Sequence, residues 1–338
     1  MHLDLVAQTV AWCSRDMTEV STIVVSGLGL CTALGPDPVP ALQAGQSAVH
    51  PHPDLVELPH QTAAFVEQID VRPWLMRRKD IKLMARPSRL ALAAAGPALA
   101  SWEQDRDAVG LFLGVGREPS DDGESEPALV AAQQDGRLDA ESVAGRCRDL
   151  YPPLLPLKTL PNMALAHISI HLGIRGENGT WCGGAAAGLT ALRSAIWSLR
   201  EGRVPAALVV AADTWVSAGG VRDLLRMSSN QVITPPGEAG VALFLETAES
   251  AKQRGAPVYA VLDLAPPVTT LATPTHHEQL GDCKAADALL ALALRIGVGP
   301  GETTITAVEP GQPAVGVRVS VESDFACYPV ARVEQSHG

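Results

Sequence analysis

The chain has 338 residues, of which 46% are hydrophobic and 19% are charged. This composition fits one large or two modest globular domains and excludes a disordered or fibrous protein. The formal net charge of −11 argues against nucleic-acid binding, because an acidic surface repels a phosphate backbone.

Residues 1–20 form a predicted N-terminal extension. The segment lacks a basic stretch ahead of an apolar one, so we expect neither a signal peptide nor a membrane anchor. Met17 is a candidate start, which leaves open whether Met1 to Asp16 is native. The 6 cysteines contain no Cys-x-x-Cys pair, which favours reduced thiols and a cytoplasmic protein over a disulfide framework.

From residue 21 the sequence alternates between short β-branched runs and Ala/Leu-rich stretches, a pattern that predicts a layered α/β fold. A buried strand is expected at Thr22–Ser26, followed by a turn at Gly27, Gly29 and Gly35 and a helix near 39–44. Gly27 and Gly29 are not followed by a third glycine at the spacing of a dinucleotide-binding loop. We therefore interpret them as part of a structural turn and expect no cofactor.

A cluster of cations follows in this otherwise acidic chain. Seven lie close together: Arg72, Arg77, Arg78, Lys79, Lys82, Arg86 and Arg89. One interpretation is a solvated helix face. The other is a docking surface for an acidic partner such as a carrier protein, with Arg77, Arg78, Lys79, Lys82 and Arg86 as the candidates. A helix at Leu90–Leu99, a buried strand at Ala108–Val115 and an exposed acidic loop at Ser120–Glu126 come next.

The most informative block runs from Leu160 to Asp213. It predicts a helix through Gly173, a short strand at Thr180–Cys182, a small-residue helix at Gly183–Leu199 and a strand at Ala206–Ala212. A strand, a sharp glycine turn and a buried helix form the elbow that presents a nucleophile at a helix N-terminus, where amides stabilise a developing anion.

This block resembles the β-ketoacyl synthases of the thiolase fold, the condensing enzymes of fatty-acid and polyketide assembly. Further segments match in order, so the resemblance covers about residues 21 to 265: IVVSGLGLCTALG at 23–35, RLALAAAGPAL at 89–99, LPNMALAHISIHLGIRGEN at 160–178 and GEAGVALFLETAESAKQRGAPVYAVL at 237–262. The resemblance implies a layered αβαβα fold with one shared core. Its N-terminal half would be 21–250, and residues 251–338 would form a shortened C-terminal half with strands near 257–263, 303–307 and 315–321.

The resemblance also locates the family's catalytic position. The catalytic cysteine lies in a T-A-C-x-x-G elbow, seven residues after the asparagine of R-G-x-N and three before the glycine. Counting from Asn178 and back from Gly188 both give Ala185. A methyl group cannot form a thioester, and losing a nucleophile lowers turnover by up to about a millionfold. Cys182 is the alternative, but it is expected at a strand end and not at the helix N-terminus.

The family's active-site histidines are also missing. The first belongs to H-G-T-G-T after a second-half strand, where this chain has Val308-Glu309-Pro310-Gly311. Too few residues follow for the helix, strand and loop that would carry the second. The glycine-rich oxyanion loop is replaced by Ser323 to Tyr328.

Other histidines have structural interpretations. His276 and His277 lie near Cys283, but adjacent histidines point in different directions and no further ligand is spaced for zinc, so we expect an exposed loop and no metal. His167 and His171 lie one helical turn apart, and packing or capping is favoured over an acid/base pair.

The sequence therefore favours a non-catalytic subunit that resembles the chain-length factor and pairs with an active β-ketoacyl synthase of type II polyketide or fatty-acid biosynthesis, where it helps to shape the acyl tunnel. The family's dimers pair strands just before the elbow, so the interface candidates are Gly179, Thr180, Trp181 and Cys182. An acyl carrier protein is a further expected partner. Two alternatives remain open: a residual enzyme, through Cys182 or by decarboxylation of malonyl carrier protein, and a homodimeric acyl-binding scaffold.

Overall fold

The computed structural model describes residues 21–56, 58, 60–116, 123–227, 234–266, 275–309 and 312–326. The predicted N-terminal extension, Cys327, Tyr328 and part of the acidic loop lie outside these residues. Eight strands form the main sheet: β1 (Ile23–Thr32), β4 (Gly110–Val115), β7 (Asn178–Cys182), β8 (Ala206–Thr214), β9 (Glu238–Thr247), β10 (Ala260–Ala265), β11 (Gly301–Ala307) and β12 (Val315–Val321).

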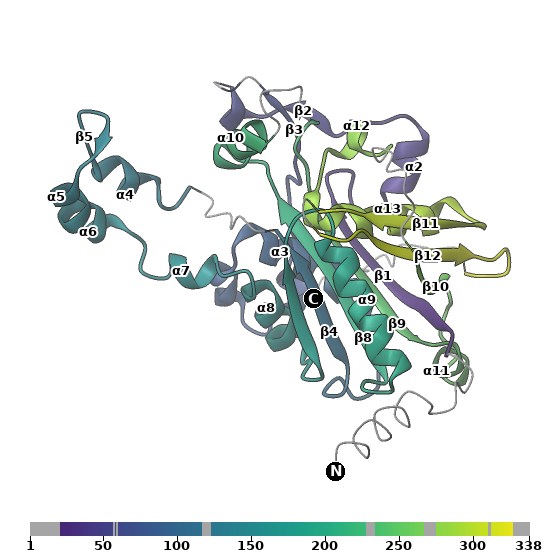
Figure 1. Ribbon diagram of the computed structural model, residues 1–338. Helices are drawn as coiled ribbons and strands as arrows, with labels where there is room; N and C mark the ends of the chain where they lie inside the picture. Colours follow the sequence, from purple (N-terminus) through teal and green to yellow (C-terminus); the bar gives the residue numbers. More distant parts are fainter. Residues whose placement is uncertain are drawn as a thin grey trace, which may run out of the picture.

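The strands of both halves of the chain belong to one sheet, in the order β11-β12-β10-β1-β9-β8-β4-β7 (Figure 1). Strand β4 runs parallel to β7 and β8, and the remaining neighbours are antiparallel. Because β1 pairs with both β9 and β10, it links the strands of the two halves within the sheet.

Helices cover both faces of this sheet. Those of the body are α2 (Pro38–Gln43), α3 (Arg86–Leu99), α8 (Met163–Leu172), α9 (Ala187–Arg200), α10 (Ala218–Met227), α11 (Ala248–Gln253), α12 (His277–Leu280) and α13 (Asp287–Val298). The core on one face joins α3 and α8 to the sheet, and the core on the other joins α9 and α13. The second core also contains Leu262, Val317 and Val319, so α9 and α13 pack against strands of both halves of the sheet.

The apolar periodicity of the sequence explains these positions. In α9 the buried leucines and isoleucine recur every three or four residues at Leu189, Leu192, Ile196 and Leu199, which gives the helix one apolar face. All residues of β8 are buried, as expected for a central strand covered on both faces.

The glycine turn expected after residue 26 is wrong. Strand β1 continues through Gly27 and Gly29 to Thr32, with an irregularity between Val25 and Gly27. A Cβ atom at Gly27 would lie 2.1 Å from Ala98 O, and one at Gly29 would lie 2.0 Å from Ala94 O. These glycines therefore let α3 lie directly against the strand; Gly35, with a φ of 90°, belongs to the turn.

Strands β11 and β12 of the second half have one apolar and one polar face. Val317 and Val319 of β12 are fully buried against the helices. The alternate residues of β11 and β12 are polar: Ser320 donates a 3.1 Å hydrogen bond to Glu302, and Arg318 lies 3.9 Å from the same carboxylate. This alternation is typical of a sheet with one face in water, so the strands do not require a further helical layer.

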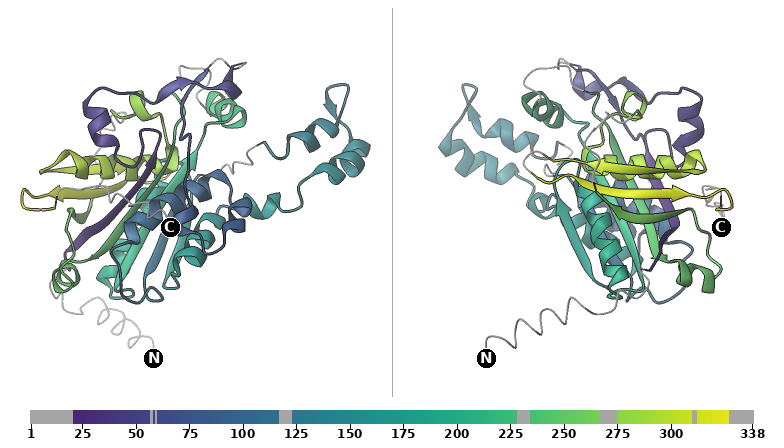
Figure 2. Two further views of the ribbon diagram at one scale, coloured as in Figure 1. Left: turned by 180° about the vertical axis from the view of Figure 1, so that it is seen from behind. Right: turned by 45° about the vertical axis from the view of Figure 1, so that its right-hand side comes forward.

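An arm formed by residues 123–160 projects from the body (Figures 1 and 2). Its elements are α4 (Glu126–Ala131), β5 (Gln133–Gln134), β6 (Arg137–Leu138), α5 (Ala140–Ser142), a π-helical turn (Val143–Cys147), α6 (Arg148–Leu150) and α7 (Leu155–Lys158). A small separate sheet pairs β2 (Val49–Pro51) with β3 (Thr62–Ala64). Across the described ranges, no helix has both the length and the apolar character needed to cross a bilayer.

Candidate functional site

The predicted elbow is present between β7 and α9. Strand β7 ends at Cys182 and α9 begins at Ala187, with Ala185 in the turn between them. Small residues allow α9 to begin directly against β4. A Cβ atom at Gly114 of β4 would lie 2.5 Å from the backbone of Gly188. The structure therefore places an alanine methyl group where the elbow presents a side chain just ahead of the helix.

A carboxylate from the second half reaches this elbow. Glu309 follows β11 and is only 6% exposed, and its Oε2 accepts a 3.0 Å hydrogen bond from the backbone amide of Gly184. A Cβ atom at Gly183 would lie 2.7 Å from the same oxygen. Glu309 thus occupies the segment where the resemblance leads one to expect the first active-site histidine, and it brings a negative group to the amides of the turn.

Cys182 lies at the end of the strand and not at the start of the helix. Its side chain is exposed, and its thiol donates to Gly116 O at 3.3 Å. A thiol is activated by a helix N-terminus or a neighbouring cation. Its position therefore differs from that of an elbow nucleophile.

Asp213, at the end of β8, is a buried acid that the sequence did not single out. Its carboxylate accepts hydrogen bonds from Trp215 Nε1 at 3.0 Å and from the amides of Thr214 and Ala285 at 2.9 and 3.2 Å. Complete burial raises its pKa to about 7, although these hydrogen bonds oppose the shift. An acidic residue at the end of a wholly apolar strand is the signal that could have identified it.

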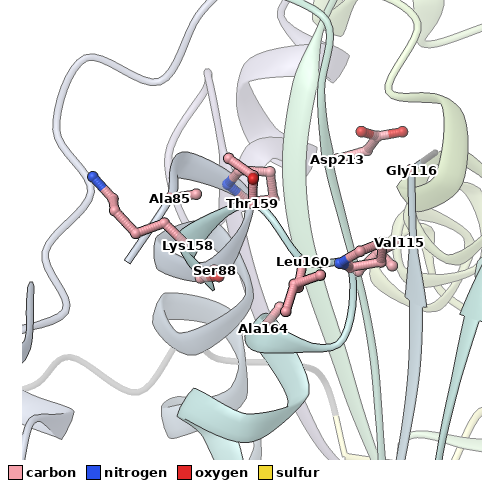
Figure 3. A pocket seen from close by; sticks show the side chains of 11 residues that line it. Ala85, Ser88, Val115, Gly116, Lys158, Thr159, Leu160, Ala164 and Asp213 are labelled. Carbon is pink, nitrogen blue, oxygen red and sulfur yellow. The ribbon is translucent and has the colours of Figure 1, made fainter. Parts of the chain in front are cut away.

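Asp213 borders a small cavity at the ends of β4 and β8 (Figure 3). Its lining residues come from the ends of β4 and β8, the start of α3 and the segment that leads into α8: Ala85, Pro87, Ser88, Val115, Gly116, Lys158, Thr159, Leu160, Pro161, Ala164 and Asp213. The ammonium group of Lys158 points away from Asp213 and pairs with Glu124. The cavity volume is about 30 Å³, which is room for a water molecule and not for an acyl chain.

The five residues of the predicted docking surface fall into two groups in the structure. Arg77, Arg78, Lys79 and Lys82 are exposed, on 3₁₀ turns and not on the expected helix face. Arg86 differs from these four residues, because its side chain is only 16% exposed. Its guanidinium forms an ion pair with the fully buried carboxylate of Glu238 and lies 3.9 Å from the ring centroid of Phe65.

His167 and His171 have the predicted packing role. Their rings stack with 5.9 Å between centroids. His167 Nε2 lies 3.3 Å from Leu83 O, and His171 Nδ1 accepts a 3.3 Å hydrogen bond from the amide of Met76. Burial lowers the pKa of both rings, so they are neutral anchors for the basic segment.

The exposed loop expected at His276 and His277 is wrong. Both side chains are buried, and both Nε2 atoms converge on Asp287 Oδ1. Adjacent histidines diverge in a strand, but here the second one begins α12, and the bend at that point brings the two rings to one carboxylate.

The predicted interface strand lies at the end of the sheet. Strand β7 is last in the strand order and pairs with β4 on one side. Trp181 is half-buried and stacks on Phe112 of β4, with 6.1 Å between ring centroids. Gly179 lies under this ring, since a Cβ atom there would meet Trp181 at 2.7 Å.

Comparisons with known proteins agree with this architecture. Residues 21–235 match the family described as "Beta-ketoacyl synthase, N-terminal domain". The chain is 27% identical over 259 residues to Nodulation protein E of Rhizobium leguminosarum bv. trifolii, covering 70% of this chain and 61% of that protein's length.

Solved structures share the fold at low sequence identity. The ishigamide ketosynthase/chain length factor matches with a TM-score of 0.71 and 18% identity, over 89% of this chain and 99% of that one. A β-ketoacyl synthase from Burkholderia phymatum STM815 matches with a TM-score of 0.69 and 16% identity, over 89% and 100%. A structure of a type II polyketide synthase acyl-carrier protein in complex with its ketosynthase bound to the hexaketide matches with a TM-score of 0.66 and 14% identity, over 89% of this chain and 100% of that one. Because the family match spans more than half of the chain and the sheet, the elbow and its flanking helices are all in place, the chain belongs to the β-ketoacyl synthase family.

Proposed function

We propose that this chain is a non-catalytic, chain-length-factor-like subunit that pairs with an active β-ketoacyl synthase of type II polyketide or fatty-acid biosynthesis. The observation that carries the proposal is the elbow itself. Ala185 supplies no nucleophile, and the adjacent amide of Gly184 already binds the carboxylate of Glu309. A chain with this elbow has lost both the group that would attack and the free amide beside it.

The end of the sheet supports pairing with a second subunit. The outer side of β7 is a strand edge, and strand addition across an edge uses main-chain groups, so it tolerates side-chain differences between partners. We expect Gly179, Thr180, Trp181 and Cys182 to lie at this contact.

The arm supports pairing independently. Its apolar side chains are unusually exposed: Leu138 is 74% exposed, Val130 64%, Leu157 55% and Leu150 53%. Several exposed apolar side chains on one projecting segment are typical of a surface that a partner covers.

The cavity at the ends of β4 and β8 holds about 30 Å³ among the described residues, which is too little space for an acyl chain. We therefore expect the contribution to the tunnel to come from surfaces that face the partner. The exposed cations Arg77, Arg78, Lys79 and Lys82 are the expected contacts for an acyl carrier protein.

Co-purification tests the proposal. The tagged chain is co-expressed with the product of any adjacent β-ketoacyl synthase gene, and the mass of the complex is measured. We expect a 1:1 complex that is lost when Leu138, Leu150 and Leu157 are changed together to Asp. A matched triple change at exposed polar arm residues, Gln133, Gln134 and Arg137 to Ser, should leave it intact. A wild-type chain that stays alone beside the active synthase would refute the proposal.

The enzymatic alternative has its own test. Labelled malonyl carrier protein is incubated with the isolated chain, and released carbon dioxide and protein-bound label are measured. We expect neither above the level of a Cys182→Ser variant. Carbon dioxide release or an acyl adduct that requires Cys182 would establish the residual-enzyme alternative instead. A long acyl ligand that raises the melting temperature of a homodimer would favour the scaffold alternative.

A further inference from the structure

Three buried side chains bring ligating atoms together at the start of α13. His276 Nε2 lies 2.9 Å and His277 Nε2 lies 2.7 Å from Asp287 Oδ1, and the ligand atoms of the three residues lie within 4.8 Å of one another. Each residue is less than a tenth exposed. We propose that these three residues bind a divalent metal ion of the zinc class.

The local fold orients both imidazoles toward one point. His276 precedes α12 and His277 begins it, while Asp287 begins α13. The two rings are nearly perpendicular, at 87°, with 5.0 Å between centroids. Two ring nitrogens therefore meet one carboxylate from a different helix, which is the donor set that zinc and related ions prefer.

The nearby acidic residue Asp282 already has a cationic partner, because Lys284 Nζ lies 2.6 Å from its carboxylate. Asp287 faces the two imidazoles instead, so an ion held by the three residues would lie directly against its carboxylate. The thiol of Cys283 is fully buried in the same segment.

Hydrogen bonding alone leaves this cluster incomplete. Among the described residues, His277 Nδ1 is buried without a hydrogen-bond partner, while both Nε2 atoms share one carboxylate oxygen. Metal binding at both Nε2 atoms needs each ring to be protonated at Nδ1 alone, so a neutral ring moves its proton from Nε2 to Nδ1 and a doubly protonated ring releases one proton to solvent. With three protein ligands, at least one position is left for water. The ion would join α12 to α13 and so have a structural role.

Metal binding by the full-length chain tests the inference. The purified protein is stripped with a chelator, and Zn²⁺ is titrated in competition with a chromophoric chelator. We expect one ion per chain at micromolar free zinc or below, and a higher melting temperature with zinc than without it. His277→Gln and Asp287→Asn should each weaken binding by on the order of tenfold or more. The exposed His50→Gln variant is the matched control and should bind as the wild type does.

A measurement without variants covers the case in which the buried substitutions prevent folding. Crystals of the wild-type chain grown with zinc should give an anomalous difference peak between His276, His277 and Asp287. Uptake of less than one ion per chain, wild-type affinity in Asp287→Asn, or an anomalous peak found only elsewhere would each overturn the inference.

Discussion

The Oε2 atom of Glu309 accepts a 3.0 Å hydrogen bond from the amide of Gly184, so a residue of the second half of the chain contacts the elbow between β7 and α9. This contact and the alanine at position 185 are complementary changes. An elbow amide stabilises a negative charge that develops during reaction, and here a permanent carboxylate already faces it. Restoring a cysteine alone should therefore not restore a reactive thiol.

Replacing Ala185 with Cys tests this relationship. In a Cys182→Ser background, we expect the new thiol to react slowly with iodoacetamide, because the nearby Glu309 carboxylate raises its pKa. Adding Glu309→Gln should increase the rate at neutral pH by about tenfold for each unit by which the pKa falls. Alkylation is followed by mass spectrometry of the intact protein. Glu302→Gln removes an exposed carboxylate from β11 and should leave the rate unchanged; an equal effect of both substitutions would contradict the expectation.

Close approach of α3 to β1 makes Gly27 intolerant of a side chain. A Cβ atom there would lie 2.1 Å from Ala98 O, so Gly27→Ala must displace the helix and should cost about 1–3 kcal/mol or more in the free energy of unfolding. Denaturant unfolding measures this. Gly145→Ala is the control, because no atom lies within 4 Å of its added Cβ. A stable Gly27→Ala variant would show that the helix does not lie this close.

Substitutions of the buried Arg86 and of the exposed Arg78 should affect different properties: the first the stability of the fold, and the second the affinity for a carrier protein. Arg86→Ala leaves the buried carboxylate of Glu238 uncompensated and should cost about 3–5 kcal/mol in the free energy of unfolding. Arg78→Ala, at an exposed position, should change it by less than about 0.5 kcal/mol. Carrier-protein affinity, measured by calorimetry, should fall for Arg78→Ala together with Lys79→Ala. Unchanged affinity in that double variant would remove these residues from the docking surface.

The His171 contact with Met76 predicts a pH dependence. Burial lowers the pKa of His171, so the folded chain binds its proton less readily than the unfolded chain does. The stabilisation is therefore complete above the unfolded pKa of about 6.5 and is lost as the pH falls through the lower folded value.

His171→Asn retains an acceptor for the Met76 amide but does not titrate. Between pH 7.5 and 5, the wild type should lose more free energy of unfolding than this variant does. His50→Asn, at an exposed position, should follow the wild type. Parallel curves for wild type and His171→Asn would show that protonation of His171 does not affect folding.

Much of this molecule was predictable from local patterns. The apolar runs of β4, β8 and α9, and the strand-turn-helix order around Ala185, depend on residues close in sequence, and the structure contains each of them. Counting from Asn178 and Gly188 along the motifs of the resembling family gave Ala185 as the elbow position, and the structure has this residue in the turn between β7 and α9.

Other features depended on contacts between distant segments. Gly27 and Gly29 indicated a turn locally, but their role is to admit α3, which comes later in the chain. Arg86 looked like its neighbouring cations until the fold placed Glu238 beside it. Convergence of His276 and His277 on Asp287 likewise required the start of α13 to lie against α12.

The sequence by itself determined the family, the order of elements and the alanine at position 185 of the elbow, since these follow from residue identity and spacing along the chain. Only the tertiary structure decided which charged groups are buried, which carboxylate meets the elbow amide and which imidazoles share a ligand. Those outcomes depend on how segments from the two halves meet in space, and hydrogen bonds and ion pairs form over a few ångströms whatever the separation in sequence.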